Sequence, residues 1–520
     1  MRLRKLSIES FKNLRGFSVS FEDEFTTVLV GPNGTGKSNV LEALIIIFRD
    51  LDLGVPPAFT YTLEYECRGA TVIVDADPKR TKAQIVISVN GDSVSLKRFA
   101  RKAGGDYLPS FVFGYYSGPS NRMESHFEPH QTRFADELLR GVDQPLRPLL
   151  YARLVHSQFV LLSFFQREDQ DRDILREHLQ IQDLESVLFV LKKPYWYSPQ
   201  RRGPQDDPGD PRFWGARGVV RDFLDRLYAL ALAPLRSRAT DRLYLFLKNK
   251  RDLMTLAQGY EGQQEFFKAL ESLYISDLIQ DVRTSVKIEG VHNALTFREL
   301  SEGEQQLLMV LGLLRFVEAR EGLILLDEPD THLNPAWSLQ YTRLLRAQVS
   351  DAATTQIMMA THDPLVVAGL TASEVLVMQR GEGGRVSASH PDQDPKGMGV
   401  AALLTSEVYG LRSALDLDTL EELDRKRELA IREDLSLEER KELANLSDRL
   451  GRLDLTTSVR DPMYKPFVDA MTRVEDKLGL NASILTPEQQ KAREAIAEEV
   501  AEKVVAESAS RPASPEEPGE

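Results

Sequence analysis

The sequence predicts an α/β fold in which two distant parts of the chain build one mixed sheet. Three short apolar runs, at 26–30, 323–326 and 356–360, are typical of strands that are buried on both faces. The first run passes through a glycine-rich turn into an apolar helical segment. A long helical insertion is expected between the two parts, and a helical C-terminal region is expected after them.

The first part of the expected α/β domain, here called the head, covers residues 1–118. Its opening residues alternate with a period of two, which predicts a half-buried hairpin. The alternating apolar positions are Leu3, Leu6, Ile8, Phe17, Val19 and Phe21. Asn90-Gly91 predicts a two-residue hairpin turn. Further strands are expected at 61–66, 71–75, 84–89 and 108–115.

Residues 119–285 are expected to form a compact helical insertion. Helical periodicity runs over 134–190 and again over 219–279, and a stretch rich in proline and glycine separates the two. Aromatic residues and prolines interrupt this pattern too often for the sustained heptads of a coiled coil.

The second part of the head is expected at 286–400, with a further strand at 375–378. Residues 401–508 have the pattern of charged helices, and Ser436 with Glu439 forms a capping box at the start of one of them. Proline and acidic residues in 509–520 predict a disordered tail. Four leucines follow the capping box at spacings of three and four, which places them on one helix face. They are Leu443, Leu446, Leu450 and Leu453.

The composition excludes several classes of protein. With 65 Lys and Arg against 79 Asp and Glu, the net charge of −14 argues against a protein that coats nucleic acid through a uniformly basic surface. Cys67 is the only cysteine, which excludes an intrachain disulfide and a cysteine-rich zinc site. No apolar run approaches the roughly 18 residues that cross a bilayer, and no signal peptide is evident. We therefore expect a cytoplasmic protein without a membrane partner.

The turn after the first buried strand, Gly31-Pro-Asn-Gly-Thr-Gly-Lys-Ser38, matches the phosphate-binding pattern G-x-x-x-x-G-K-[ST]. Glycines allow backbone N–H groups to surround phosphate oxygens, and the following helix N-terminus favours negative charge. Lys37 would reach the β- and γ-phosphates, and the Ser38 hydroxyl would hold Mg²⁺. The expected nucleotide-binding residues are Gly31, Pro32, Asn33, Gly34, Thr35, Gly36, Lys37, Ser38 and Asn39.

Two adjacent carboxylates end the buried strand that begins at Gly322. Ligand-binding groups of parallel sheets lie at the carboxyl ends of strands, so this position favours a functional role. Asp327 is expected to hold Mg²⁺ together with Ser38. Glu328 is expected to polarise the water that attacks the γ-phosphate.

Three further segments complete an ordered set of motifs. Leu300-Ser-Glu-Gly-Glu-Gln-Gln306 precedes a long apolar helix, Asp330-Thr-His-Leu-Asn-Pro335 follows the two carboxylates, and Thr361-His-Asp-Pro364 follows the next buried strand. With the phosphate loop, these segments resemble the motifs of ABC-type ATPases, a group of P-loop NTPases, in the order found there.

The resemblance to ABC-type ATPases implies ATP and Mg²⁺ as cofactors and assigns catalytic roles to Lys37, Glu328 and the switch histidine His362. It also implies that Ser301, Gly303 and Glu304, at a helix N-terminus, bind the γ-phosphate that a second head holds. Because the chain contains one set of motifs, a homodimer or a higher homo-oligomer is expected.

The segments Ile8–Leu14 and Ser38–Ala43 resemble the RecF, SMC-like and overcoming-lysogenisation-defect (OLD) ATPases, and Lys12 falls where such heads place a basic residue near the phosphates. The resemblance covers about 1–118 and 285–380. A head without a nuclease centre resembles ATPase subunits of bacterial antiviral defence, among them Septu-type ATPases, which work with a separate HNH nuclease, and restriction-system-associated ATPases. The loop Tyr115–Arg122 resembles a loop of that group.

No nuclease or metal centre is expected outside the nucleotide site. His126 and His130 have i, i+4 spacing, but Pro129 disfavours a regular helix between them. Four C-terminal acidic residues have the pattern of a solvated helix surface rather than of a nuclease site. They are Asp461, Asp469, Glu475 and Asp476.

Three functions stay open. The leading one is an ATPase that regulates a partner nuclease in phage defence; the alternative is a RecF-like DNA repair ATPase that binds DNA with ATP, and a third is a scaffold that binds ATP and barely hydrolyses it. The segment Lys192–Arg202 mixes cations with aromatic rings, which suits nucleic-acid contact through the insertion and equally suits a solvated loop.

Overall fold

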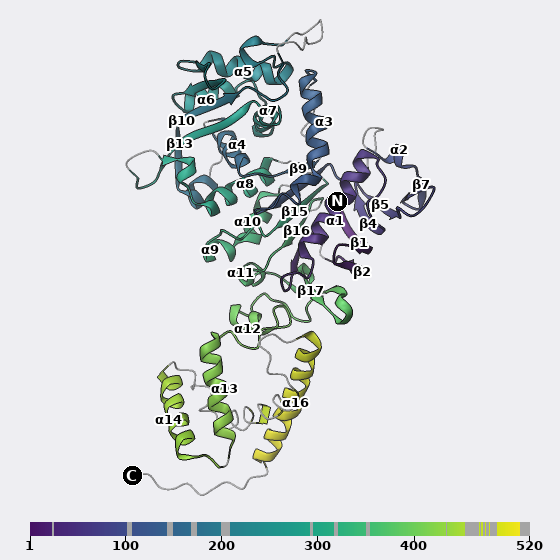
Figure 1. Ribbon diagram of the computed structural model, residues 1–520, viewed down its shortest axis with the longest axis vertical. Helices are drawn as coiled ribbons and strands as arrows, with labels where there is room; N and C mark the ends of the chain where they lie inside the picture. Colours follow the sequence, from purple (N-terminus) through teal and green to yellow (C-terminus); the bar gives the residue numbers. More distant parts are fainter. Residues whose placement is uncertain are drawn as a thin grey trace. The chain divides into compact units, whose positions relative to one another are not determined.

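The computed structural model describes residues 1–22, 25–100, 107–142, 149–167, 174–198, 209–291, 295–316, 321–349, 354–432, 434–452 and 486–509, with the single positions 467, 470, 471, 474 and 478. These residues fall into two units, 1–393 and 394–520, and each is described by itself (Figure 1).

A seven-stranded sheet forms the centre of the first unit, with the order β18-β17-β3-β16-β15-β8-β9. All of its pairings are parallel except the one between β17 and β18. The strands predicted at 26–30, 323–326, 356–360 and 375–378 are confirmed, and they join both predicted parts of the chain. The strands are β3 (Thr26–Val30), β8 (Phe111–Tyr116), β9 (Leu149–Tyr151), β15 (Gly322–Asp327), β16 (Gln356–Ala360), β17 (Val375–Arg380) and β18 (Val386–Ser389).

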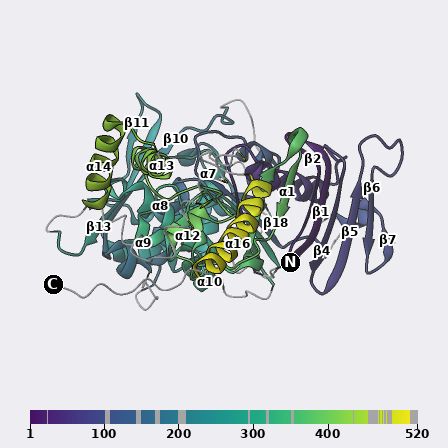
Figure 2. The ribbon, with the colours of Figure 1, turned by 90° about the horizontal axis from the view of Figure 1, so that it is seen from below.

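A second, antiparallel sheet packs on the same core through helix α1 (Lys37–Leu53). Apolar side chains of both sheets and of α1 form one buried cluster, and Figure 2 shows this sheet at one side of the unit, beyond α1. The predicted hairpins are confirmed, including the Asn90-Gly91 turn between β6 and β7. In the order β2-β1-β4-β5-β6-β7, the strands are β1 (Arg2–Phe11), β2 (Leu14–Ser20), β4 (Tyr61–Cys67), β5 (Ala70–Ala76), β6 (Ile85–Val89) and β7 (Asp92–Val94).

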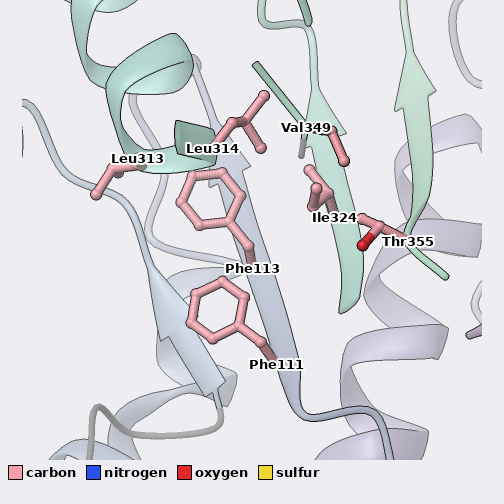
Figure 3. A pocket seen from close by; sticks show the side chains of 7 residues that line it. All are labelled: Phe111, Phe113, Leu313, Leu314, Ile324, Val349 and Thr355. Carbon is pink, nitrogen blue, oxygen red and sulfur yellow. The ribbon is translucent and has the colours of Figure 1, made fainter. Parts of the chain in front are cut away.

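The opposite face of the parallel sheet is covered by helix α8 (Glu302–Phe316). Because side chains alternate along a strand, Val112 of β8 joins the α1 cluster whereas Phe111 and Phe113 point the other way. These two rings line a small apolar gap against Leu313 and Leu314 of α8 (Figure 3). The gap is a feature of core packing.

Helix α4 (Val155–Phe164) is buried along its length and packs on α8 and on α7 (Gln263–Ile275). The contact with α8 depends on Gly312, where a Cβ atom would lie 2.1 Å from Cγ1 of Val160. The insertion and the head are therefore in direct contact through these helices. The other helices of the unit are α2 (Leu96–Phe99), α3 (Glu128–Leu139), α5 (Gly218–Leu230), α6 (Lys250–Ala257), α9 (Pro335–Ser338), α10 (Tyr341–Gln348) and α11 (Pro364–Val367).

The expectation of an insertion made only of helices is wrong. Residues 119–285 also supply most of a five-stranded antiparallel sheet, here called the insertion sheet, with the order β11-β12-β10-β13-β14. The apolar run within 181–192 has a pattern that is compatible with a helix, because periodicity alone does not separate a short buried strand from a buried helix. It forms a strand because it pairs with residues 242–247 and 279–288, which are distant in the sequence. The strands are β10 (Ile181–Lys192), β11 (Leu235–Ser237), β12 (Arg242–Leu247), β13 (Ile279–Ile288) and β14 (Leu295–Thr296).

In the part that the structure describes, the second unit is built mainly of helices, as predicted. In α14, Leu446 and Leu450 are buried and Leu443 is half-buried, and α14 packs on α13 (Figure 1). Leu453, the acidic residues between 461 and 476, and the tail 510–520 lie outside the described residues. Among the helices of the described ranges, none has the length and apolarity to span a bilayer. The described helices of the second unit are α12 (Val400–Thr405), α13 (Leu417–Ile431), α14 (Leu437–Arg452) and α16 (Pro487–Ala509).

Candidate nucleotide site

Four neighbouring parallel strands, β3, β16, β15 and β8, end at the same edge of the central sheet. The segments that follow them carry the phosphate loop, Thr361-His362, the pair Asp327 and Glu328, and Ser117. Ligands of open parallel sheets bind at such an edge. Motifs that are separated by up to about three hundred residues in the sequence therefore lie next to one another.

The phosphate loop has the backbone that a close approach to an anion requires. Gly31, Gly34 and Gly36 have φ values of 137°, 82° and 100°, which disfavour side chains, and α1 begins at Lys37. At Gly31 a Cβ atom would lie 2.2 Å from the backbone oxygen of Met378. Lys37 Nζ donates to the backbone oxygens of Gly31 (2.7 Å) and Pro32 (3.3 Å).

Two asparagines support the loop from the β1–β2 turn. Asn13 Nδ2 donates to the backbone oxygen of Gly34 (2.8 Å), and Asn39 Nδ2 donates to Asn13 Oδ1 (2.7 Å). Asn39 was expected at the site from its place beside Ser38. Asn13 was not, because a polar turn residue has no distinguishing pattern. Lys12 Nζ lies 2.5 Å from Glu42 Oε2 on α1.

Ser38 and Asp327 come together as a pair of oxygen ligands would. Ser38 Oγ donates to Asp327 Oδ1 at 2.9 Å, and the Asp327 carboxylate is 1% exposed. Mg²⁺ is commonly bound through one or two carboxylates and substrate phosphates, so these donors fit that ion. Burial raises the pKa of Asp327 above its ordinary value, while the Ser38 hydrogen bond and the charge of Arg122 oppose the rise.

Glu328 and His362 form the second pair. The Glu328 backbone is left-handed (φ 51°), and its N–H donates to the backbone oxygen of Ala360 (2.8 Å), which places its side chain beside the end of β16. His362 Nδ1 lies 3.6 Å from Glu328 Oε1. Both side chains are partly exposed, at 32% and 54%, so water reaches them.

Electrostatics connect Lys37 with the two carboxylates. Burial lowers the pKa of the Lys37 ammonium below its ordinary value, and Glu328 and Asp327 act in the opposite direction. An anionic phosphate beside Lys37 would favour its charged form further.

Ser301, Gly303 and Glu304 form a separate cluster at the start of α8. The Ser301 N–H and hydroxyl both donate to Glu304 Oε2, at 2.7 and 2.8 Å, and Ser301 is exposed. A Cβ atom on Gly303 would lie 2.3 Å from the backbone oxygen of His332. The signature segment therefore packs directly against the loop that follows Glu328.

Asp330, in that same loop, is buried and accepts a hydrogen bond from Thr361 Oγ1 (2.7 Å). Burial raises its pKa to about 6. Because Thr361 precedes His362, Asp330 joins the loops that follow β15 and β16.

Arg122 is a site residue that the nucleotide motifs did not identify. Its Nη2 donates to Asp327 Oδ2 at 2.7 Å, and its guanidinium lies 4.7 Å from the centre of the Tyr116 ring. The only signal in the sequence was its place in the loop after a predicted strand.

Several known proteins and protein families are similar to parts of this chain. A family model described as "AAA ATPase domain" matches residues 1–92, and one described as "AAA domain, putative AbiEii toxin, Type IV TA system" matches residues 197–368. The Septu protein PtuA of Bacillus mycoides is 27% identical over 238 residues, which are 44% of this chain and 33% of that protein. The DNA replication and repair protein RecF of Chlorobium luteolum is 29% identical over 159 residues, 27% of this chain and 42% of that protein.

The chain is therefore similar, over parts of its length, to AAA-type ATPase domains, to a Septu protein and to a RecF protein. The alignments with these two relatives cover less than half of either relative's own length.

Solved SMC heads resemble the chain at low similarity. The SMC head domain of Thermotoga maritima aligns with 75% of this chain and 99% of its own length at 16% identity, with a TM-score of 0.32. An SMC head bound to the C-winged helix domain of ScpA aligns with 75% and 98% at 11% identity, with a TM-score of 0.34. The fold of the first unit is defined by the strand order of its central sheet.

His126 and His130, the pair with i, i+4 spacing, contact two different carboxylates of α1. His126 Nε2 lies 2.9 Å from Glu42 Oε1, and His130 Nε2 lies 2.9 Å from Asp52 Oδ2. In the part of the chain that the structure describes, no group of three or more His, Cys, Asp or Glu side chains is arranged to hold a metal ion.

The aromatic and basic segment Lys192–Arg202 begins at the last residue of β10. Lys192 pairs with Asp277, and Lys193 Nζ lies 3.5 Å from Asp241 Oδ2, so neighbouring carboxylates offset both charges. Tyr195 is 83% exposed and available for stacking. Residues 199–202 of this segment lie outside the described residues.

Proposed function

We propose that this chain is an Mg²⁺-dependent ATPase that dimerises around ATP and regulates a partner nuclease in antiviral defence. The observation that carries the ATPase assignment is the placement of Lys37, Ser38, Asp327, Glu328 and His362 at the ends of adjacent parallel strands. Each side chain has the chemistry that hydrolysis of a phosphoanhydride requires.

In this proposal the phosphate loop cradles the phosphates and Lys37 contacts the β- and γ-phosphates. Ser38 and Asp327 would hold Mg²⁺, which supplies charge neutralisation at the phosphate oxygens. Glu328 orients and polarises the attacking water, and His362, 3.6 Å away, holds Glu328 in place and faces the γ-phosphate.

Dimerisation follows from the location of the signature cluster. Ser301 is exposed at the N-terminus of α8, where N–H groups and the helix dipole favour a phosphate. One head supplies the phosphate loop and a second copy supplies Ser301 and Gly303 to the same nucleotide. Glu304, which accepts two hydrogen bonds from Ser301, orients that residue.

Dimerisation is tested by light scattering of the purified Glu328→Gln variant with and without ATP. We expect ATP to convert monomers into dimers, and Ser301→Ala in the same background to prevent the conversion. A dimer that forms equally without ATP, or that tolerates Ser301→Ala, would contradict this assignment.

The defence role rests on the similarity to the Septu protein, of which the alignment covers 33%. A separate nuclease, with the HNH type as the first candidate, is the partner we propose. Copurification from the native host with mass spectrometry tests this, and the absence of a nuclease from the ATP-bound complex would argue against it.

The second candidate is a RecF-like repair ATPase, favoured by the 29% identity to RecF over 159 residues. It requires that the isolated protein bind DNA in the presence of ATP, with affinity that falls as salt rises. Because ion pairs offset the charges of Lys192 and Lys193, we expect these two lysines to contribute little to direct binding.

A further inference from the structure

Asp327 already has a cation beside it. Both carboxylate oxygens are engaged: Oδ1 accepts from Ser38 Oγ at 2.9 Å, and Oδ2 accepts from Arg122 Nη2 at 2.7 Å. The carboxylate is 1% exposed, so these two partners replace the water that would otherwise solvate it.

The two partners respond differently to a divalent cation. The Ser38 hydroxyl has lone pairs and can turn to become a ligand itself. The Arg122 guanidinium only donates hydrogen bonds, carries a positive charge and repels a second cation at the same carboxylate. Arg122 and Mg²⁺ therefore compete for Asp327.

Arg122 has a second contact, which does not involve Asp327. Its side chain is 34% exposed, and its guanidinium lies 4.7 Å from the centre of the Tyr116 ring, a favourable cation–π geometry. The arginine can leave Asp327 without becoming buried and unpaired, because the ring face and water remain available to it.

We propose that Arg122 is the counter-ion of Asp327 in the metal-free protein and is exchanged for Mg²⁺ when the nucleotide binds. This proposal rests on the proposed ATPase function and adds a positioning residue to it. Arg122 holds the buried carboxylate in place, and it sets the Mg²⁺ concentration at which the site is filled.

The short segment after Arg122 connects the site with the insertion and with α1 through side-chain contacts. Glu124 pairs with Arg153, just before α4, and Arg153 also donates to Tyr274 Oη of α7 (2.5 Å). His126 binds Glu42 of α1; because Arg49 Nη1 donates to His126 Nδ1, the Nε2 proton is the one shared with Glu42. The segment that follows Arg122 therefore contacts both the insertion and the phosphate-loop helix.

The test titrates Mg²⁺ against the full-length protein at a fixed concentration of ATP and follows nucleotide binding, with the melting temperature of the ligand-free protein as a second readout. Arg122→Gln should lower the Mg²⁺ concentration for half-maximal binding by about ten-fold, because no cation has to be displaced. It should also lower the ligand-free melting temperature, because Asp327 loses its partner.

Two further variants make the result specific. Arg122→Lys keeps a cation, so its Mg²⁺ requirement should lie between those of the wild type and Arg122→Gln; this variant also serves if Arg122→Gln does not fold. Arg133→Gln is the matched control, because Arg133 forms an ion pair with Glu137 on α3 and is similarly exposed, at 39%. It should change neither readout.

An unchanged or higher Mg²⁺ requirement in Arg122→Gln would overturn the proposal, and so would weaker ATP binding at saturating Mg²⁺, which would mean that Arg122 contacts the nucleotide. A wild-type protein that binds no ATP at any Mg²⁺ concentration would instead refute the proposed function itself.

Discussion

The central parallel sheet and the insertion sheet, which flank α8 and α4, differ in how their charged side chains are paired. At the carboxyl edge of the parallel sheet, Lys37 is buried with only carbonyl oxygens as hydrogen-bond partners in its own loop, and Glu328 is held in a left-handed backbone. In the insertion sheet and its neighbours, Lys192, Lys193 and Lys250 each pair with an aspartate. We expect the carboxyl edge of the parallel sheet to bind and act on a ligand, because Lys37 is hydrogen-bonded there to neutral carbonyl oxygens rather than to a carboxylate.

The largest effect that this contrast predicts is on hydrolysis. Glu328→Gln should slow ATP turnover by about 100-fold or more while ATP binding is preserved, because the amide keeps the shape of the side chain and loses its basicity. Asp183→Asn, which alters a partly exposed ion pair with Lys250 in the insertion, is the control and should leave turnover unchanged. Equal turnover by Glu328→Gln and the wild type would exclude Glu328 as the base.

The second prediction concerns Asp330, whose pKa burial raises to about 6. The folded protein holds this proton more tightly than the unfolded chain, so the Asp330 contribution to stability falls as the pH rises from about 4 to about 6. Asp330→Asn keeps an acceptor for Thr361 without the charge. Its stability relative to the wild type should therefore increase by about 3 kcal/mol between pH 4 and pH 7, as measured by denaturant unfolding. The same stability difference at both pH values would contradict the assignment.

The third prediction tests the contact between the two regions. Gly312→Ala would place a Cβ atom 2.1 Å from Val160 Cγ1, and the resulting overlap should cost about 1–2 kcal/mol of unfolding free energy after the helix preference of Ala is included. Val160→Ala in the same protein should relieve most of this cost, which a double-mutant cycle would reveal. Additive losses would mean that α4 and α8 do not pack as described.

The smallest effect is expected at the exposed end of the insertion. Tyr195 is 83% exposed, so Tyr195→Ala should change stability by less than about 0.5 kcal/mol and should leave ATP turnover unchanged. Denaturant unfolding and a turnover assay check this. A loss of single-stranded DNA binding in this variant would favour the repair function over the defence function.

The sequence predicted the head better than the insertion for a physical reason. The phosphate loop, Asp327 and His362 belong to short segments whose residue types the chemistry dictates, and local patterns place each at a strand end. Strand β10 has no such local determinant: its apolar run is compatible with a buried helix, and its strand state depends on β12 and β13. Arg122 and Asn13 were missed because their roles arise from the three-dimensional contacts alone.

The central claim, that ATP binds at the carboxyl edge of the parallel sheet, is tested most directly by measuring Mg²⁺-ATP binding to the full-length protein and its Lys37→Ala variant by isothermal titration calorimetry. The wild type should bind ATP, and Lys37→Ala should lose detectable binding while it keeps the wild-type circular dichroism spectrum. Unchanged affinity in a folded Lys37→Ala protein would contradict the claim.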